Sequence, residues 1–196
     1  LPGKYNAYNA AAAATAAQAL GIKGDAIEHG IESLKTLSGR LQEVSTGKPY
    51  KVVIDYAHTP DGLRKVLIAV RELCSGNVWL VFGACGDRDR IKRPQMGEIA
   101  AHLADKIIVT DEESYSEDPA EIRAAVIEGI NSIKGASKKL TEIPDRKAAI
   151  DYALKNAKKG DLILITGLGH EQIRIEDGKK IPWNDADVVQ NLLNKR

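Results

Sequence analysis

The sequence predicts an α/β domain with a doubly wound, mostly parallel sheet, preceded by two helices. Short apolar runs without polar alternation recur along most of the chain, which is typical of strands buried on both faces. Amphipathic stretches with helical spacing separate these runs, so each strand can be followed by a helix that crosses over the sheet. An alanine-rich opening segment contains no such strand and is predicted to be helical.

The opening segment predicts helices at 6–20 and 25–37. The first contains the run Ala10 to Ala14, which combines high helix propensity with small side chains. The second has aliphatic side chains on one face: Ile27, Ile31 and Leu34. Because alanines bury little area each, these helices make a poor core alone, and we expect them to pack against another part of a protein. The alternative is an ordinary helical prelude to the following domain.

From Lys51 onward, predicted strands and helices alternate. The strands are expected at 52–54, 78–82, 106–109, 140–143 and 162–165. The helices are expected at 61–74, 94–103, 120–130, 146–156 and 185–193. Pro94 marks the start of its helix, because proline suits the first helical turn. Residues 172–181 predict a hairpin centred on Asp177-Gly178.

Composition excludes several classes of function. The 196 residues are 43% hydrophobic and 28% charged, which suits a globular domain with a substantial core. A net charge of +1 and 5% aromatic residues argue against nucleic-acid binding. No apolar run is long enough to span a bilayer. Cys74 and Cys85 form no CxxC or metal spacing and are typical of thiols in a reducing cytosol. We therefore expect a cytoplasmic protein that binds neither nucleic acid nor membrane.

Polar loops follow the predicted strands, at 55–60, 83–94, 111–118 and 167–171. In doubly wound sheets, ligands bind in the crevice beyond the carboxyl ends of the strands. One polar loop would simply meet solvent. Four such loops, two of them rich in glycine, favour a binding cleft.

The side chains in these loops suggest what the cleft would bind. Basic residues that could bind a carboxylate or phosphate are Arg88, Arg90, Lys92 and Arg93. Acidic residues that could receive an ammonium group are Glu112, Glu113 and Glu171. Basic groups on one side and acidic groups on the other suit a zwitterionic amino acid, and one with a further amine, such as lysine, would fit. Internal salt bridges between the same loops are the alternative.

Other catalytic patterns are missing from the sequence. His58 follows a strand beside Asp55, a possible base with a possible orienting partner, but no GxSxG accompanies it to suggest a hydrolytic triad. A structural or nucleotide-contacting role for His58 is favoured. No HExxH, GxGxxG or GxxxxGK[ST] occurs, so we assign neither a metal ligand nor a catalytic residue within this chain.

Five short motifs are specific in their order and spacing, and they are spread over nearly the whole length of the chain. Residues 2–10 resemble PGxFNxxN, 39–43 resemble GRxE, 55–60 read DYAHTP, 86–94 read GDRDxxKRP, and 169–171 keep the end of GKGHE. This set resembles the Mur ligases, and most closely the branch that adds the third stem-peptide residue to UDP-N-acetylmuramoyl-dipeptide. The resemblance also implies the family's Rossmann-like C-terminal fold.

The resemblance implies an ATP-dependent acid–amino-acid ligase of peptidoglycan biosynthesis. ATP would phosphorylate a carboxylate of the UDP-muramoyl dipeptide, the amine of a free amino acid would attack the acyl phosphate, and Mg²⁺ would hold the phosphates. By the motif match, Arg40 and Asp55 would contact the nucleotide, with Asp55 on the ribose and His58 nearby. The implied amino-acid-binding residues are Arg88, Glu112, Glu113, Tyr115, Gly167 and Glu171. Among them, Arg88 would bind the carboxylate and Glu171 the amine.

Two departures from the family pattern bear on the substrate. Enzymes that add meso-diaminopimelate commonly have DNPR where this chain has residues 112–115, and their arginine clasps the distal carboxylate. Tyr115 cannot supply that charge, and Glu112 and Glu113 would repel a carboxylate. We therefore expect a preference for lysine, ornithine or another diamine-type residue. Leu168 replaces a usual lysine, which makes a non-standard substrate possible.

The resemblance also predicts the domain organisation. Residues 1–38 would be the helical end of a central ATPase domain, and 39–196 the amino-acid-binding domain. The P-loop and the UDP-sugar domain would precede residue 1, so we expect a fragment of a longer ligase that is inactive alone, with ATP and Mg²⁺ bound mainly by the missing central domain. The alternatives are another ligase of the superfamily, such as a folylpolyglutamate or cyanophycin synthetase, and a non-catalytic Mur-like module that binds an amino acid or a partner.

Overall fold

The computed structural model describes residues 3–34, 36–176 and 178–195. These residues form a six-stranded sheet with the order β1-β2-β6-β3-β4-β5. The strands are β1 (Gln42–Val44), β2 (Lys51–Asp55), β3 (Val78–Phe82), β4 (Lys106–Val109), β5 (Leu140–Glu142) and β6 (Leu162–Thr166). β1 runs antiparallel to β2, and the other neighbouring strands are parallel. The predicted class of fold is confirmed.

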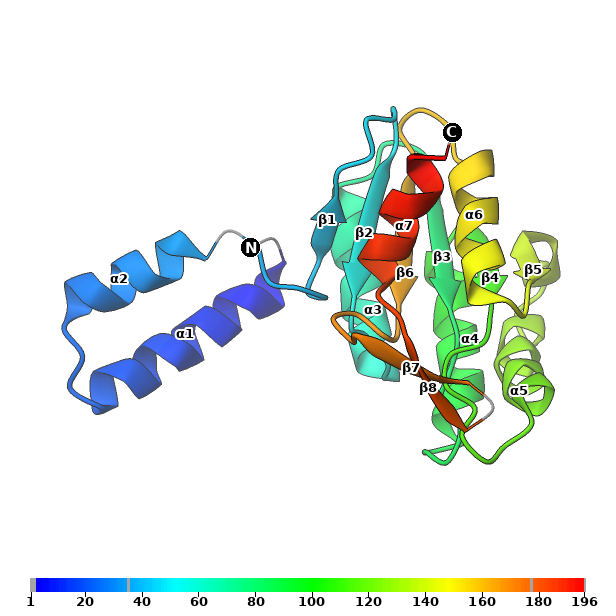
Figure 1. The fold of residues 1–196 in the computed structure, drawn as a ribbon, viewed down its shortest axis with the longest axis horizontal. Coiled ribbons are helices and arrows are strands. Elements are labelled where there is room, and N and C mark those ends of the chain that lie inside the picture. Colours follow the sequence, from blue (N-terminus) through cyan, green and yellow to red (C-terminus); the bar gives the residue numbers. More distant parts are fainter. Residues whose placement is uncertain (1–2, 35, 177, 196) are drawn as a thin grey trace.

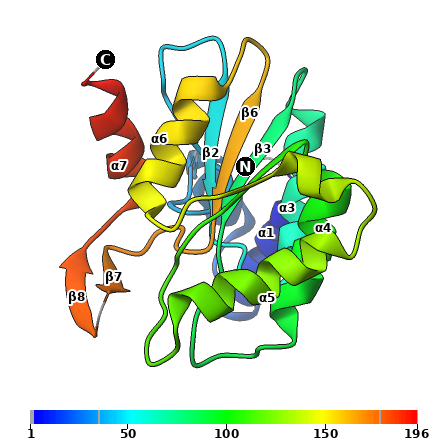
Figure 2. The same ribbon diagram turned by 90° about the vertical axis from the view of Figure 1, so that its right-hand side faces the viewer.

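Helices cover both faces of the sheet (Figures 1 and 2). One face packs against α3 (Pro60–Glu72), α4 (Lys92–Leu103) and α5 (Pro119–Asn131), and the other against α6 (Arg146–Asn156) and α7 (Asp185–Leu193). In β2, Val53 belongs to the first core, while Val52 and Ile54 belong to the second. Burial on both faces explains why the strand sequences show no polar alternation.

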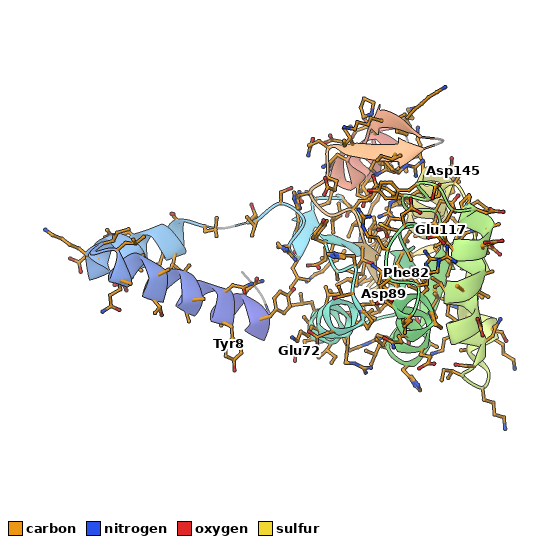
Figure 3. The ribbon with its side chains drawn as sticks, turned by 90° about the horizontal axis from the view of Figure 1, so that it is seen from below. Tyr8, Glu72, Phe82, Asp89, Glu117 and Asp145 are labelled. Carbon is orange, nitrogen blue, oxygen red and sulfur yellow. The ribbon has the colours of Figure 1, made fainter. Side chains whose placement is uncertain are left out.

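The first two helices form an arm that projects from the sheet domain (Figure 1). They are α1 (Lys4–Ala19) and α2 (Gly24–Ser33). Tyr8 points away from the arm and is 78% exposed (Figure 3). On the second helix and just beyond it, Ile31 and Leu34 remain 40% and 46% exposed. The arm therefore has little core of its own.

The structure adds detail that the sequence pattern did not predict. Strand β1 and a short 3₁₀-helix, η1 (Ala136–Lys139), were not expected. Helix α4 begins at Lys92, so that Pro94 lies within its first turn rather than at its start. The hairpin is confirmed as β7 (Ile173–Glu176) and β8 (Lys179–Pro182), with the predicted turn residue Asp177 outside the described residues. Pro2 of the first motif also lies outside them.

A buried ion pair joins the two helices on the second face to the end of β6. Arg146 donates from Nε and Nη2 to the Asp185 carboxylate at 2.9 and 2.7 Å, and from Nη2 to the carbonyl of Thr166 at 2.9 Å. Both charged side chains are fully buried. These contacts fix the carboxyl end of β6, where the loop 167–171 begins. Among the described residues, no helix has the length and apolarity needed to cross a bilayer.

Candidate functional site

A cleft of about 540 Å³ lies at the carboxyl ends of β2, β3, β4 and β6, as the sequence predicts. The lining residues are Tyr56, His58, Thr59, Pro60, Cys85, Arg88, Asp89, Lys92, Gln95, Glu112, Glu113, Tyr115, Gly167, Leu168 and Glu171. All the residues predicted to bind the amino acid are among them. Of those predicted to contact the nucleotide, His58 lines the cleft, whereas Arg40 and Asp55 do not.

Arg88 and Lys92 form the basic side of the cleft. The guanidinium of Arg88 lies over the ring of Tyr115, 5.1 Å from its centroid, and donates to the carbonyl of Asp87 at 3.1 Å. Lys92 Nζ donates to the carbonyl of His58 at 2.9 Å. Within the part of the chain that the structure describes, neither cation has an ion-pair partner. Both remain available to an anionic group of a ligand.

Arg90 and Arg93 do not face a ligand. Arg93 is buried and donates to both oxygens of the Glu117 carboxylate, at 2.9 and 2.8 Å, while Arg90 lies 3.0 Å from the same carboxylate. These bonds lower the pKa of Glu117 to about 2, with the Arg93 hydrogen bonds as the main cause. The alternative of internal salt bridges is therefore correct for these two arginines, and they leave the set of candidate ligand-binding residues.

The acidic side of the cleft has a buried and an accessible carboxylate. Glu112 is only 6% exposed and accepts the S–H of Cys85 at 2.9 Å. Burial raises the pKa of Glu112, and burial together with the Glu112 charge raises the pKa of the Cys85 thiol, which is therefore protonated. Glu113 is half-buried. The charge facing a ligand therefore comes more from Glu113 and Glu171 than from Glu112.

Glu113 and Tyr115 are held together at the position of the family's selectivity loop. The Tyr115 hydroxyl donates to Glu113 Oε2 at 2.8 Å, and Glu113 Oε1 accepts the backbone N–H of Ile175, in β7, at 3.0 Å. Tyr115 has a φ of 50°, in the left-handed region that non-glycine residues rarely adopt. The hydrogen bond to Glu113 and the contact with Arg88 hold the Tyr115 ring in one position. These contacts compensate for the strained backbone conformation.

The residues predicted to contact the nucleotide lie beside the cleft. Arg40 is exposed and lies 5.3 Å from the ring centroid of Tyr56. Asp55 is 4% exposed, and its carboxylate accepts the backbone N–H groups of Leu41 at 2.8 Å and Ala57 at 2.9 Å. Its burial raises its pKa. In this structure Asp55 therefore anchors the segment that carries Arg40.

His58 is not paired with Asp55, so the possible arrangement of a base with Asp55 as its orienting partner is not formed in this structure. His58 Nδ1 lies 2.8 Å from the carbonyl of Tyr56, to which it donates. The carboxylate of Asp55 is turned towards backbone N–H groups instead. This arrangement fixes the ring orientation of His58, which agrees with a contacting role.

Sequence reasoning left out several lining residues, of which Tyr56 and Cys85 have the most contacts. Tyr56 lies in the polar loop 55–60, within the DYAHTP motif, and Cys85 lies in the polar loop 83–94. Neither has a charge to suggest a role. What distinguishes them is contact with residues distant in sequence, which the motif alone does not reveal.

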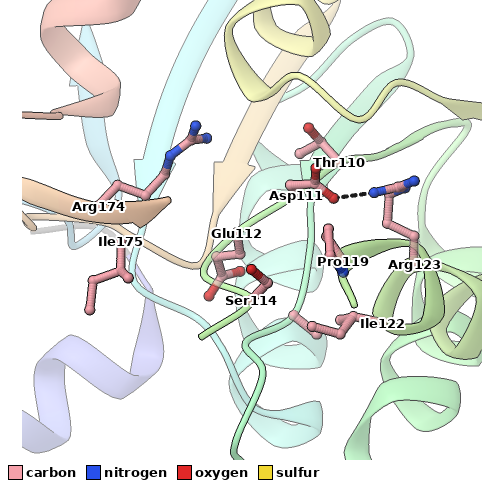
Figure 4. A pocket seen from close by; sticks show the side chains of 10 residues that line it. Thr110, Asp111, Glu112, Ser114, Pro119, Ile122, Arg123, Arg174 and Ile175 are labelled. Atoms are coloured by element: carbon pink, nitrogen blue, oxygen red, sulfur yellow. Dashed lines mark hydrogen bonds and ion pairs between the residues drawn. The ribbon is translucent and has the colours of Figure 1, made fainter. Parts of the chain in front are cut away.

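A smaller cavity of about 90 Å³ adjoins the cleft and shares Glu112 with it. Figure 4 shows Arg174 and Ile175 of β7 on one side and Ile122 and Arg123 of α5 on the other. Arg123 pairs with Asp111, and Arg174 lies 4.4 Å from the ring centroid of Trp183. The β7–β8 hairpin thus forms an outer wall beside the loop 111–118.

Comparison with known proteins identifies the family. The model of the Mur ligase, glutamate ligase domain, matches residues 39–169. The chain belongs to the Mur ligase family. Its sequence is 44% identical over 193 residues to the UDP-N-acetylmuramoyl-L-alanyl-D-glutamate–2,6-diaminopimelate ligase of Caldanaerobacter subterraneus subsp. tengcongensis, and 40% identical over 193 residues to that of Vibrio vulnificus. These matches cover 98% of this chain, and 39% and 38% of the two relatives.

Solved structures agree with this Mur ligase assignment. One with the same enzyme name superimposes with a TM-score of 0.76 at 34% identity, covering 100% of this chain and 39% of the other. A folylpolyglutamate synthase of Mycobacterium tuberculosis shares the fold, with a TM-score of 0.66 at 23% identity, covering 85% of this chain and 38% of its own. The sequence relatives therefore favour the cell-wall branch, as the motifs do. The chain spans about two fifths of the length of the curated relatives it matches.

Proposed function

We propose that this chain is the amino-acid-binding domain of an ATP-dependent ligase that adds a diamino acid to UDP-N-acetylmuramoyl-dipeptide. The observation that carries the proposal is the single cleft lined by Arg88 and Lys92 as well as by Glu113 and Glu171. A carboxylate of the incoming amino acid would pair with Arg88, whose guanidinium can bind it through two hydrogen bonds. Glu171 would hold its amine.

The reaction would join an acid and an amine through an acyl phosphate. ATP would phosphorylate the dipeptide carboxylate and release ADP, and the neutral amine held in the cleft would attack the acyl carbon, so that phosphate and a proton leave. On this chain Arg40 and His58 would contact the nucleotide, and Asp55 would hold Arg40 in place and reach the ribose. Because the substrates include ATP, we place the reaction in the cytoplasm.

Mg²⁺ would belong to another part of the protein. Among the described residues, no group of three or more His, Cys, Asp and Glu side chains could hold a metal ion. The described residues therefore do not fit a magnesium cage. We place the phosphates of ATP, with the ion, on the preceding domain.

The arm would be the end of that preceding domain. Its exposed aliphatic side chains, and a large apolar hollow lined by both helices, suit packing against a further layer of protein. All the residues that line this hollow lie between Asn6 and Leu37, so none of them comes from the sheet domain. Residues 1–38 would therefore belong to the ATPase domain and residues 39–196 to the amino-acid-binding domain.

The choice of amino acid turns on Glu113 and Tyr115. The relatives named above are diaminopimelate ligases, whereas this chain has Glu113 and Tyr115 in the loop to which the resemblance assigns the distal group of the amino acid. A distal ammonium group would instead be attracted by Glu113. We therefore propose lysine or ornithine as the preferred substrate over diaminopimelate.

Phosphate release by the full-length protein tests these assignments. We expect release that requires ATP, the UDP-muramoyl dipeptide and a diamino acid, with a product mass that identifies the amino acid. Arg88→Gln should raise KM for the amino acid about tenfold, as expected for the loss of a charge-assisted bond. Arg64→Gln, at an exposed position on α3, is the matched control and should change nothing.

Other outcomes are decisive too. A higher kcat/KM with diaminopimelate than with lysine would reject the amino-acid assignment but keep the ligase. Amino-acid binding without phosphate release would favour the non-catalytic module.

A further inference from the structure

Tyr56 lies where the nucleotide side and the amino-acid side of the site meet. It follows the last residue of β2, and its backbone N–H donates to the carbonyl of Gly39 at 2.7 Å. The guanidinium of Arg40 lies 5.3 Å from the centroid of its ring. A cation at this distance is attracted to the face of a tyrosine. One side of Tyr56 is therefore packed against the residues proposed to meet the nucleotide.

The same side chain also contacts the amino-acid side. Its hydroxyl donates to Glu171 Oε1 at 3.4 Å, a long bond that a small movement would shorten. Its ring centroid lies 4.8 Å from that of His58 and 4.9 Å from that of His170. Tyr56 thus contacts two other parts of the sequence, residues 39–40 and 170–171, as well as His58 in its own loop.

Close backbone packing holds the loop 167–171 against Tyr56. Gly169 has a φ of 53°, and a Cβ added there would lie 2.7 Å from Tyr56 Cβ and 2.9 Å from its Cα. Only glycine leaves room for this approach. Because there is no gap between them, a displacement of Tyr56 must move the loop that carries Glu171.

We propose that Tyr56 is a positioning residue that couples nucleotide binding to amino-acid binding. A nucleotide that contacts Arg40 and His58 holds the ring of Tyr56 between them. The hydroxyl then orients the carboxylate of Glu171 to receive the amine. This inference rests on the proposed function, because it takes the two groups of ligand contacts from it. By thermodynamic linkage, the amino acid must strengthen nucleotide binding by the same factor.

Variants of the full-length protein separate the ring from the hydroxyl. Tyr56→Phe keeps the ring contacts and loses the bond to Glu171. We expect it to raise KM for the amino acid about threefold to tenfold, as for one lost hydrogen bond, while ATP binding in the absence of the amino acid is unchanged. Tyr56→Leu removes the ring as well and should weaken the binding of both ligands. Tyr152→Phe, at an exposed position on α6, is the control and should change neither.

Calorimetry of amino-acid binding, with and without a non-hydrolysable ATP analogue, tests the coupling itself. The unaltered protein should bind the amino acid more tightly with the analogue, and Tyr56→Phe should lose that gain at an unchanged melting temperature. An unchanged KM for the amino acid in Tyr56→Phe, or a retained gain, overturns the inference. If the unaltered protein releases no phosphate with any diamino acid, the proposed function fails and this inference fails with it.

Discussion

At the scale of single residues, the cleft keeps two charged residues of the family motifs and differs from the family at residue 115. Arg88 and Glu171 stand at positions that the family motifs predict, and both line the cleft. Tyr115 occupies the place of a family arginine, yet its hydroxyl donates to Glu113 and its ring packs against the guanidinium of Arg88. The side chain that replaces the arginine is therefore held in the loop by contacts of its own.

Tyr115→Arg in the full-length protein tests whether residue 115 selects the amino acid by the charge of its distal group. The new guanidinium can pair with a distal carboxylate, so kcat/KM for diaminopimelate relative to lysine should rise about tenfold or more, as for one charged hydrogen bond. Tyr115→Phe supplies no charge and is the control. If both variants leave the ratio of kcat/KM values for diaminopimelate and lysine unchanged, residue 115 does not contact the distal group of the amino acid.

Sequence motifs predicted most of the residues in the cleft loops. They did not predict which of these residues are free to bind a ligand and which form bonds within the protein. Arg90 and Arg93 carry the same charge as Arg88 and follow it closely in the sequence. Only the loop 111–118, brought alongside by the pairing of β3 with β4, supplies the Glu117 carboxylate that occupies them. Long-range contacts of this kind leave no trace in a local pattern.

At the scale of elements, Glu117 fastens the loop after β3 to the loop after β4. Its bonds to Arg93 lower its pKa from 4.5 to about 2. The stabilisation is therefore fully present above about pH 4.5 and is lost as the pH falls towards 2, since the unfolded chain takes up the proton first. Melting temperatures of the protein and of Glu117→Gln should differ at pH 7 and converge as the pH falls towards 2. A difference that stays constant over this range contradicts the assignment.

The Arg146–Asp185 pair fixes α6 and α7 to the end of β6, and its removal should be costly. Arg146→Met leaves a buried, unpaired carboxylate, and we expect a loss of about 3–5 kcal/mol in the free energy of unfolding. Denaturation by urea measures it. Lys65→Ala, which breaks an exposed pair with Asp61, should cost no more than about 1 kcal/mol. Equal costs for the two variants would contradict a structural role for the buried pair.

Most elements could be predicted because their apolar pattern is strong. β1 could not, since Gln42–Val44 places a single buried side chain inward and becomes a strand only by pairing with β2. The start of α4 also shifted by two residues, because Lys92 and Arg93 extend the helix in front of Pro94.

At the scale of the whole molecule, the arm and the sheet domain differ in how they are stabilised. The sheet domain has two buried cores, whereas the described part of α2 buries no residue. We expect residues 39–196 alone to unfold cooperatively, within a few degrees of the melting temperature of the 196-residue chain. Calorimetry of both measures it. Failure of the shorter chain to fold would place the domain boundary elsewhere.

The bond between Arg93 and Glu117 also has an evolutionary consequence. A buried arginine without its carboxylate, or the reverse, leaves an uncompensated charge inside the loop pair. Natural selection should therefore remove single changes at either position faster than paired ones. In a set of related sequences, residues 93 and 117 should be kept or replaced together. The identity of residue 88, in contrast, should vary only with the amino acid that is bound.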